Sequence, residues 1–327
     1  MSTNILLTII ALLVGIVALS IRWAKVRSVD PELARKLLTA AIIFFGLLVF
    51  FLVIGGEDLV SERRHDYADP EELNRYSYEH YAPVSYSIRG DGVVLDACGA
   101  KATLTGIYQD DSYGSVSYKA EYLLENTSDQ PLCLSFDCVC VNGRAVESGY
   151  DYFYDWLRPG DAVTVYGSLY SLADSSVSEL VYTGMSVFDG DQYVYHSEDF
   201  LRISTDSPAL PAPEILGGKL LYEGNGFRII NTGVDDYGYV LCIVNDTDND
   251  FRASTANMKL DGEETYSTSG VYDSAIPAHS VFTSSSVYGY DREYNRIVDG
   301  GVLETSISFT CHADPSSDFS TGYFQLN

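Results

Sequence analysis

Residues 116–124 read VSYKAEYLL, in which apolar or aromatic side chains alternate with polar ones. A period of two places the two kinds of side chain on opposite faces of a β-strand. Runs of similar length recur at 132–141, 162–169 and 302–310, and Gly, Asn and Asp interrupt the chain between them. Short strands at short spacing, without a helical period, predict an antiparallel β-sandwich.

The strand pattern occurs twice along the chain. Residues 122–127 (YLLENT) match residues 242–247 (CIVNDT) at an offset of 120, and residues 140–143 (CVNG) match 259–262 (KLDG) at 119. Two further landmarks, RPG at 158–160 and MSV at 185–187, have counterparts in IPA at 276–278 and ISF at 307–309. Four landmarks in one order at nearly one offset predict a duplicated module of about 110 to 120 residues.

A proline-rich segment separates the two copies. Residues 207–213 (SPALPAP) hold three prolines, which is typical of a stiff interdomain linker. We therefore expect one β-sandwich domain over 87–206, a linker over 207–218 and a second β-sandwich domain over 219–327.

The N-terminal end of the chain differs from the rest. Residues 1–21 and 37–56 contain no charged side chain, and each run is close to the ~20 residues that a helix needs to cross a bilayer. We expect a transmembrane hairpin over 1–56, with helices at about 3–21 and 37–56. The loop 22–36 holds five Lys or Arg against two acidic residues, which favours a cytoplasmic loop. Both termini and the β domains would then be extracellular, in a two-pass protein of the cell membrane. The alternative, a cleaved signal peptide, lacks the basic region that such a peptide needs.

The net charge limits the partners. The 327 residues carry a formal net charge of −26, which excludes nucleic acid as a partner because phosphate binding needs a basic face. Residues 57–86 are highly charged and contain a helix-start signal, DPEE, at 69–72. This segment is predicted to be a solvated juxtamembrane stalk.

These features together resemble a family. A membrane anchor followed by tandem modules that read strand, Glu-Asn-Thr turn, strand, Val-Asn-Gly, then Pro-Gly before another strand resembles the immunoglobulin-like exodomains of Gram-positive bacterial surface proteins. The resemblance covers residues 90–327. It implies an all-β fold of two tandem immunoglobulin-like β-sandwich domains and no activity. With the hairpin predicted above, the expected fold class is an N-terminal two-helix transmembrane hairpin followed by these two domains. The Cys-Trp-Cys spacing of antibody domains is absent, because Trp156 follows Cys138 and Cys140 with no later cysteine in that domain.

The six cysteines divide into four in the first module and two in the second. An even number in each module is typical of extracellular disulfides, and Cys242 with Cys311 is the candidate pair. Cys138 and Cys140 share one face of a strand, which disfavours a bond between them. Two alternatives stay open, namely buried free thiols and a metal site formed by the cysteines of the first module.

Two acidic pairs occupy similar settings. Asp110-Asp111 and Asp235-Asp236 each precede a Tyr-Gly dipeptide or nearly so, and calcium prefers such oxygen ligands. The same residue types are favoured in turns through their own backbone hydrogen bonds, and neither loop has the spacing of a dedicated calcium loop. We expect turns and no cofactor, with calcium as the alternative.

Tyrosine is abundant, with 26 copies, and it clusters in 150–156 (YDYFYDW) and 288–294 (YGYDREY). Tyrosine supplies a large contact area at a low entropic cost, as in recognition loops. The alternative is that tyrosine suits half-buried strands. The candidate ligand-binding residues are Tyr150, Tyr152, Tyr154, Trp156, Tyr288 and Tyr290.

Catalytic motifs are missing from the sequence. It contains no Gly-x-Ser-x-Gly elbow, no His-Glu-x-x-His and no phosphate-binding glycine loop, so we expect no catalytic residues. The predicted function is a membrane-anchored extracellular binding or structural module without catalytic activity, or an accessory subunit of a cell-envelope complex. Its partner would be an extracellular protein or glycan, with a further association through the transmembrane helices. The alternatives are a membrane-anchored carbohydrate hydrolase that uses two carboxylates and a calcium-stiffened spacer.

Overall fold

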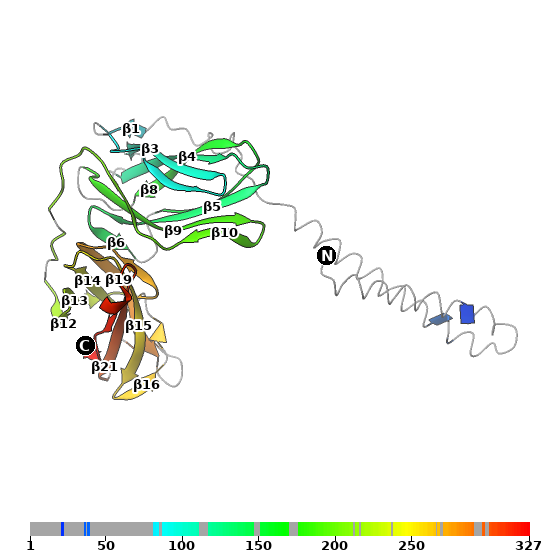
Figure 1. Cartoon of the computed structure of the whole chain (residues 1–327). Coiled ribbons are helices and arrows are strands. Elements are labelled where there is room, and N and C mark those ends of the chain that lie inside the picture. The colour runs from blue at the N-terminus through cyan, green and yellow to red at the C-terminus, as the bar shows by residue number, and fades with distance from the viewer. Residues whose placement is uncertain are drawn as a thin grey trace. The chain divides into compact units, whose positions relative to one another are not determined.

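The computed structural model describes residues 81–84, 87–110, 117–146, 151–169 and 176–327, the last with gaps at 212, 216, 237, 266, 269–270, 291–295 and 298–300. Ile21, Arg22, Lys36, Leu38 and Thr39 are described as well. The chain divides into two compact units, Met1–Tyr67 and Ala68–Asn327. The second unit contains every strand of the described chain (Figure 1).

The N-terminal half of this unit, β1 to β11, has two layers. One layer is a five-stranded sheet in the order β1-β3-β4-β8, with β2 also paired to β3. It consists of β1 (Tyr81–Pro83), β2 (Val93–Ala97), β3 (Ala100–Asp110), β4 (Ser117–Asn126) and β8 (Ala162–Leu169). The facing strands are β5 (Leu132–Val141), β6 (Arg144–Val146), β7 (Asp151–Leu157), β9 (Glu179–Asp189), β10 (Gln192–Ser197) and β11 (Leu201–Ser204). Alternation of apolar and polar residues builds these layers, since every second residue of β4 is buried.

The C-terminal half, β12 to β23, repeats this plan. A six-stranded sheet runs in the order β16-β15-β21-β22, with β18 beside β15 and β23 beside β21. It consists of β15 (Phe251–Leu260), β16 (Glu263–Thr265), β18 (Ser274–Ile276), β21 (Leu303–Cys311), β22 (Phe319–Ser320) and β23 (Phe324–Gln325). The other layer holds β12 (Lys219–Gly224), β13 (Phe227–Val234), β14 (Tyr239–Asn245) and β19 (Ser280–Tyr290), with the short β17 (Ser267–Thr268) and β20 (Arg296–Ile297) beside β19.

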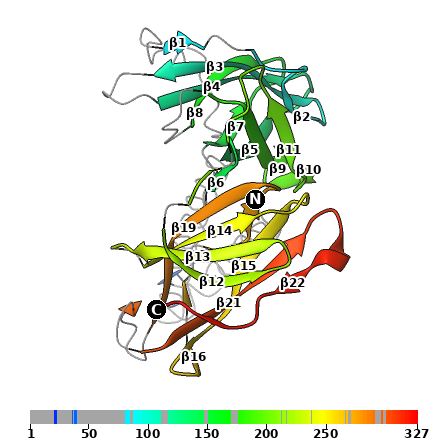
Figure 2. The same cartoon turned by 90° about the vertical axis from the view of Figure 1, so that its left-hand side faces the viewer.

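One sheet runs through both halves. The strand β6 pairs in parallel with β19, so that the order β10-β9-β5-β6-β19-β14-β13-β12 belongs to a single twelve-stranded sheet. Arg144 lies opposite Val281, and the Val281 amide donates a hydrogen bond of 2.8 Å to the Gly143 carbonyl. Figure 2 shows β6 beside β19 where the two halves meet.

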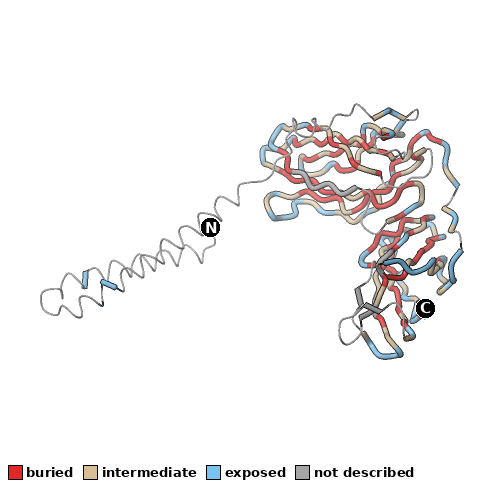
Figure 3. The backbone as a smooth tube through the Cα atoms, turned by 180° about the vertical axis from the view of Figure 1, so that it is seen from behind, coloured by how far each residue is buried: buried red, intermediate tan, exposed pale blue. Residues whose placement is uncertain are grey.

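Each half has its own hydrophobic core, and the second core extends into the first half. The rings of Tyr122, Phe136 and Tyr182 pack together in the N-terminal core at centroid distances of 5.2 to 6.2 Å. Phenylalanines dominate the C-terminal core, where Phe227 contacts Phe309. Val139, Cys140, Ala145 and Val181 of the N-terminal half belong to this second core. Figure 3 shows buried segments in both halves.

The repeat is visible in the hydrogen bonds, at an offset of 119 throughout. The side-chain Nδ2 of Asn126 donates to the carbonyls of Gln130 and Leu157, and the side-chain Nδ2 of Asn245 donates to those of Asn249 and Ile276. The expected offset of 120 at this landmark is therefore wrong by one residue. In a strand, a shift of one residue exchanges the buried and exposed faces, so only the offset of 119 places both asparagines in the interior.

The expected fold class, a two-helix transmembrane hairpin followed by two tandem immunoglobulin-like β-sandwich domains, is wrong for the described chain. The described residues form an all-β structure with open sheets, and the parallel pair of β6 and β19 joins the two sets of strands. No helix found among them is long and apolar enough for a membrane crossing. The runs 1–21 and 37–56 lie almost wholly outside the described residues. Within the predicted stalk 57–86, residues 81–83 instead form β1, which pairs with β3.

Candidate functional site

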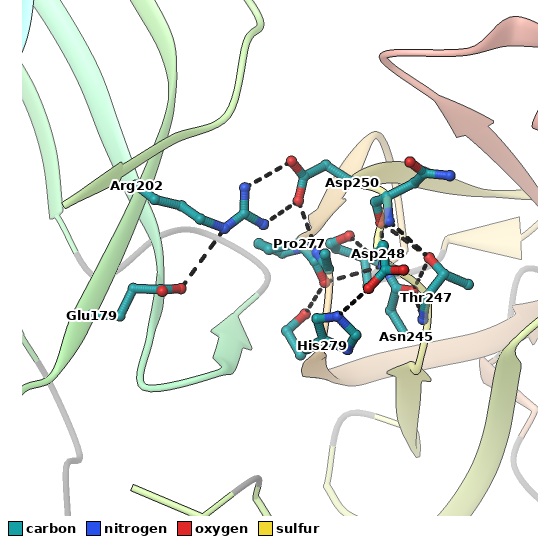
Figure 4. A network of polar contacts seen from close by, with 12 residues as sticks. Glu179, Arg202, Asn245, Thr247, Asp248, Asp250, Pro277 and His279 are labelled. Atoms are coloured by element: carbon teal, nitrogen blue, oxygen red, sulfur yellow. Dashed lines mark hydrogen bonds and ion pairs between the residues drawn. The ribbon is translucent and has the colours of Figure 1, made fainter. Parts of the chain in front are cut away.

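The junction between the two halves is rich in ion pairs. Arg202, in β11, directs its guanidinium at the carboxylate of Asp250, which directly precedes β15 (Figure 4). Its Nη1 donates to Oδ2 at 2.9 Å, and its Nη2 contacts Oδ1, so the pairing has two points of contact. Glu179 lies on the other side of the guanidinium, 3.8 Å from its Nε. Two-point pairs of this kind fix orientation as well as distance.

A tight turn holds Asp250 in place. Asp250 Oδ1 accepts a hydrogen bond of 2.8 Å from the Ala278 amide, and the Asn245 amide group donates to the carbonyls of Asn249 and Pro277. Asn245 is completely buried, so its hydrogen bonds compensate for the cost of removing an amide from water. The Asp250 carboxylate is therefore positioned before it contacts the other half.

A second arginine crosses the junction from the opposite direction. Arg252 Nη1 donates to the carbonyl of Asp273 at 3.0 Å and to its carboxylate at 3.2 Å. Arg252 Nη2 donates to Thr183 Oγ1 at 3.2 Å and also contacts the Glu198 carboxylate. Thr183 and Glu198 belong to the N-terminal half. A third pair, His312 Nε2 with Asp199 Oδ1 at 2.6 Å, also crosses the junction.

Beside Arg252 lies a cavity of about 210 Å³, which we call the junction cavity. Asp137, Thr183, Glu198, Arg252, Asp273 and Ser274 supply its polar lining, and Val139, Val146 and Ala275 supply apolar lining. The described chain has four buried side-chain nitrogen or oxygen atoms without a hydrogen-bond partner. Three of them, Asp137 Oδ1, Arg252 Nε and Ser274 Oγ, belong to residues that line this cavity.

Asp137 is the unusual titratable group of the cavity. Its pKa is raised to about 6, because burial penalises the carboxylate more than the charge of Arg252 stabilises it. A carboxyl group with this pKa changes its protonation state close to neutral pH. Such groups occur at functional sites more often than elsewhere.

A line of polar residues continues from the cavity onto β10. His196 Nε2 lies 2.7 Å from Glu198 Oε1, and its Nδ1 lies 2.9 Å from Ser186 Oγ. The residue types are those of a nucleophilic triad. However, Ser186 is only 3% exposed, and its hydroxyl also lies 3.3 Å from the Gly184 carbonyl. These three residues therefore form a cross-strand polar contact that supports Glu198.

Two larger cavities border the linker. One, of about 320 Å³, adjoins Arg202, Pro213 and His279, and the other, of about 400 Å³, adjoins Arg144, Pro213 and Cys242. Neither is lined by a described residue that has an unpartnered buried polar atom. The buried Cys140 thiol at the first cavity has a raised pKa, chiefly because of burial and then because of the charge of Glu179.

The candidate aromatic residues do not form one described site. Trp156 is buried and lies opposite Cys133 in the pair of β7 and β5, which is a packing position. Tyr288 is half-buried in β19. Tyr150 and the side chains of Tyr152, Tyr154 and Tyr290 lie outside the described residues.

The two acidic pairs lie in separate halves. Asp110, at the end of β3, is buried, and its Oδ2 lies 4.0 Å from Lys119 Nζ. Asp235 Oδ1 accepts a hydrogen bond from the Gly238 amide, as a turn residue does. Asp236 is exposed beside it, and Asp111 is outside the described residues. In the described part of the chain, no three His, Cys, Asp or Glu side chains are grouped to hold a metal ion.

All six cysteines are free thiols, so the expected disulfide between Cys242 and Cys311 is not formed. The two residues belong to different sheets, Cys242 to the twelve-stranded sheet and Cys311 to the six-stranded sheet. The Cys242 sulfur lies 3.7 Å from Thr283 Oγ1 on the neighbouring strand. Five of the cysteines are buried and Cys98 is exposed. The alternative of buried free thiols therefore describes five of the six.

Sequence reasoning missed the junction cavity, although one signal was available. Asp137 is the only charged residue in the strand 132–141, LCLSFDCVCV. A lone carboxylate within an apolar strand either faces water or needs a partner. Arg252 and Ser274 carry no comparable signal, because only the meeting of the two halves brings them to Asp137.

Comparisons with known proteins do not assign this chain to a family. No protein-family model matches it, and no curated protein matches it. Functional conclusions therefore rest on the junction and its residues.

Proposed function

We propose that this protein is a binding or structural module without catalytic activity, in which the two halves act as one rigid unit. The observation that carries the proposal is the twelve-stranded sheet, which continues from one half into the other through β6 and β19. Backbone hydrogen bonds across a junction resist rotation in a way that a flexible linker does not.

Side chains support the same conclusion. Arg202 with Asp250 and Arg252 with Glu198 connect the halves in opposite directions. Val139, Cys140 and Val181 extend the C-terminal core into the N-terminal half, so apolar burial adds to the ion pairs. A rigid module presents its two ends at a fixed separation, which suits a spacer or a receptor for a partner that spans both halves. An extracellular location and an extracellular protein or glycan partner stay predictions from the sequence.

Pulsed electron spin resonance on the full chain tests the rigidity. Cys98 is the exposed native thiol, and Leu220→Cys adds a second label site on the exposed side of β12. We expect one narrow distribution of distances between the two nitroxides. A broad distribution would contradict a rigid junction. Leu220→Cys combined with Cys98→Ser carries a single label, and it controls for distances between molecules.

A second candidate function is favoured by one observation. Asp137 has a pKa raised to about 6, and the carboxylates of Glu198 and Asp273 line the same cavity. A carboxyl group of raised pKa near an ionised carboxylate is the arrangement that carbohydrate hydrolases use. The full chain would be incubated with a panel of nitrophenyl glycosides. Turnover that Asp137→Asn abolishes would establish the hydrolase and exclude the non-catalytic module.

A further inference from the structure

The junction cavity contains unsatisfied hydrogen-bonding capacity. Ser274 is only 4% exposed, and its hydroxyl has no partner, as is true of Asp137 Oδ1 and Arg252 Nε. Each such group costs about 1–3 kcal/mol when it is removed from water without a partner. Three at one cavity, out of four in the described chain, indicate that a polar molecule completes the site.

The three atoms require different partners. Arg252 Nε is a donor and needs an acceptor, whereas the Asp137 carboxylate accepts and needs a donor. A hydroxyl group satisfies both requirements, and Ser274 Oγ pairs with a hydroxyl in either role. An ammonium group cannot accept from Arg252. A carboxylate or phosphate cannot donate to Asp137, and it would meet the negative charges of Glu198 and Asp273 as well.

The guanidinium of Arg252 is held in place by its own contacts. Thr183, Glu198 and Asp273 fix the two Nη atoms of Arg252, which leaves Nε in a defined position. A binding group that is positioned in advance loses little entropy when the ligand arrives. Val139, Val146 and Ala275 give the cavity an apolar wall, which suits the C–H groups of a polyol or sugar.

The size of the cavity limits the ligand. About 210 Å³ corresponds to about seven water molecules, at about 30 Å³ each. This space accommodates a four-carbon polyol or part of a single sugar ring. Asp273 lines the cavity and its side chain is 63% exposed, so a ligand can enter from solvent.

We propose that the junction cavity binds a small, neutral, polyhydroxylated ligand, such as a four-carbon polyol or part of one sugar unit, through Asp137, Arg252 and Ser274. This inference rests on the binding role proposed above and adds the chemical class of the ligand.

Saturation-transfer NMR on the full chain, with erythritol as the probe, tests the proposal. Butane-1,4-diol has the same carbon chain but lacks adjacent hydroxyl groups, and it serves as the matched control ligand. We expect saturable binding of erythritol with a dissociation constant of about millimolar, and no saturable binding of butane-1,4-diol. Absence of saturable erythritol binding, or equal binding of both compounds, would overturn the proposal.

Two serine variants locate the binding. Ser274→Ala should weaken erythritol binding about fivefold, because one hydrogen bond is lost. Ser284→Ala removes the fourth unpartnered buried atom, which is not at the cavity, and should leave the binding unchanged. Equal affinity of wild type and Ser274→Ala would place erythritol elsewhere and overturn the proposal. The comparison of the two ligands on wild-type protein does not depend on the folding of either variant.

The two proposals can fail separately. A narrow distribution of spin-label distances without erythritol binding would retain the rigid module and reject the ligand class. Erythritol binding together with a broad distribution of spin-label distances would retain the ligand class and reject the rigid module.

Discussion

Asn126 and Asn245 lie 119 residues apart, and each closes its turn with the same hydrogen bonds. The Asn126 side-chain oxygen accepts from the Ser128 amide at 3.0 Å and hydroxyl at 2.7 Å. The Asn245 oxygen accepts from the Thr247 amide and hydroxyl at the same two distances. Both asparagines are almost completely buried. A single polar side chain in each half therefore connects the end of one strand to the two segments that follow it.

We expect Asn126→Ala and Asn245→Ala each to lower the free energy of unfolding by about 2–3 kcal/mol, because each leaves buried carbonyl groups without a donor. Urea denaturation of the full chain measures this. Asn249→Ala is the matched control, because the Asn249 side chain is exposed and only its backbone joins the turn. A change within about 0.5 kcal/mol is expected for the control. An equal loss in all three variants would contradict a special role of the buried amides.

The pair of Arg202 and Asp250 should contribute a measurable coupling energy. In a double-mutant cycle of Arg202→Ala and Asp250→Ala, we expect about 1 kcal/mol, since the pair has two contacts and is partly buried. The pair of Arg228 and Asp246 lies within one half and is more exposed, so about 0.3 kcal/mol is expected there. Urea denaturation of the wild type and the variants of each cycle, at low and at high salt, would measure both coupling energies. A coupling energy no larger than that of the exposed pair would show that the pair of Arg202 and Asp250 does not specifically stabilise the junction.

Asp137 should make stability fall as the pH rises from about 4 to about 6. Its pKa in the folded state is raised to about 6, against an ordinary value of 3.8, so in this window the folded chain holds a proton that the unfolded chain has lost. The full shift corresponds to about 2–3 kcal/mol. Asp137→Asn should flatten this slope and unfold at a higher urea concentration than wild type at pH 7.5. Unchanged pH dependence would contradict the burial of the carboxylate.

Asp314 provides a control of opposite sign. Hydrogen bonds from Ser316 and then Ser317 lower the pKa of its carboxyl group. The stability from this group is therefore present above its ordinary pKa and is lost as the pH falls below it. Asp314→Asn should change the slope of stability against pH only at the acid end, and its effect on stability should be constant between pH 5 and 7. A changed slope of that variant between pH 5 and 7 would show that the slope assigned to Asp137 comes from another source.

Thiol chemistry should separate Cys98 from the other five cysteines. We expect one thiol per chain to react rapidly with Ellman's reagent in the native protein, and all six to react after denaturation without reductant. Burial shields the other thiols, and it also raises the pKa of Cys140, which disfavours the reactive thiolate. Cys98→Ser should abolish the rapid reaction. Fewer than six thiols after denaturation would indicate a disulfide.

Strands were predictable from the sequence because their signal is local. The runs 132–141 and 162–169 coincide with β5 and β8, and 116–124 and 302–310 differ from β4 and β21 by one or two residues at an end. The repeat was predictable as well, but its register was not. Matching Thr127 with Thr247 favours an offset of 120, whereas the turn requires a buried amide at Asn126 and Asn245 and accepts Ser or Thr two residues later.

The candidate site was not predictable, because its residues come from separate parts of the chain. Asp137, Arg252 and Ser274 meet only where the two halves pack, and that packing depends on the pairing of β6 with β19. The three residues of β6 carry no sequence pattern that identifies a partner more than a hundred residues away. The aromatic clusters were more conspicuous in the sequence. However, Trp156, the last residue of the cluster 150–156, is a buried packing residue.

The pairing of β6 with β19 also determines the order of events during synthesis. When the N-terminal half has emerged from the ribosome, β6 still has one edge without a paired strand. Its partner segment around Val281 emerges later. An open strand edge is a template for another chain, so nascent copies on one message are exposed to wrong pairing throughout that interval. The edge of β6 is therefore covered only when β19 has been synthesised and has paired with it.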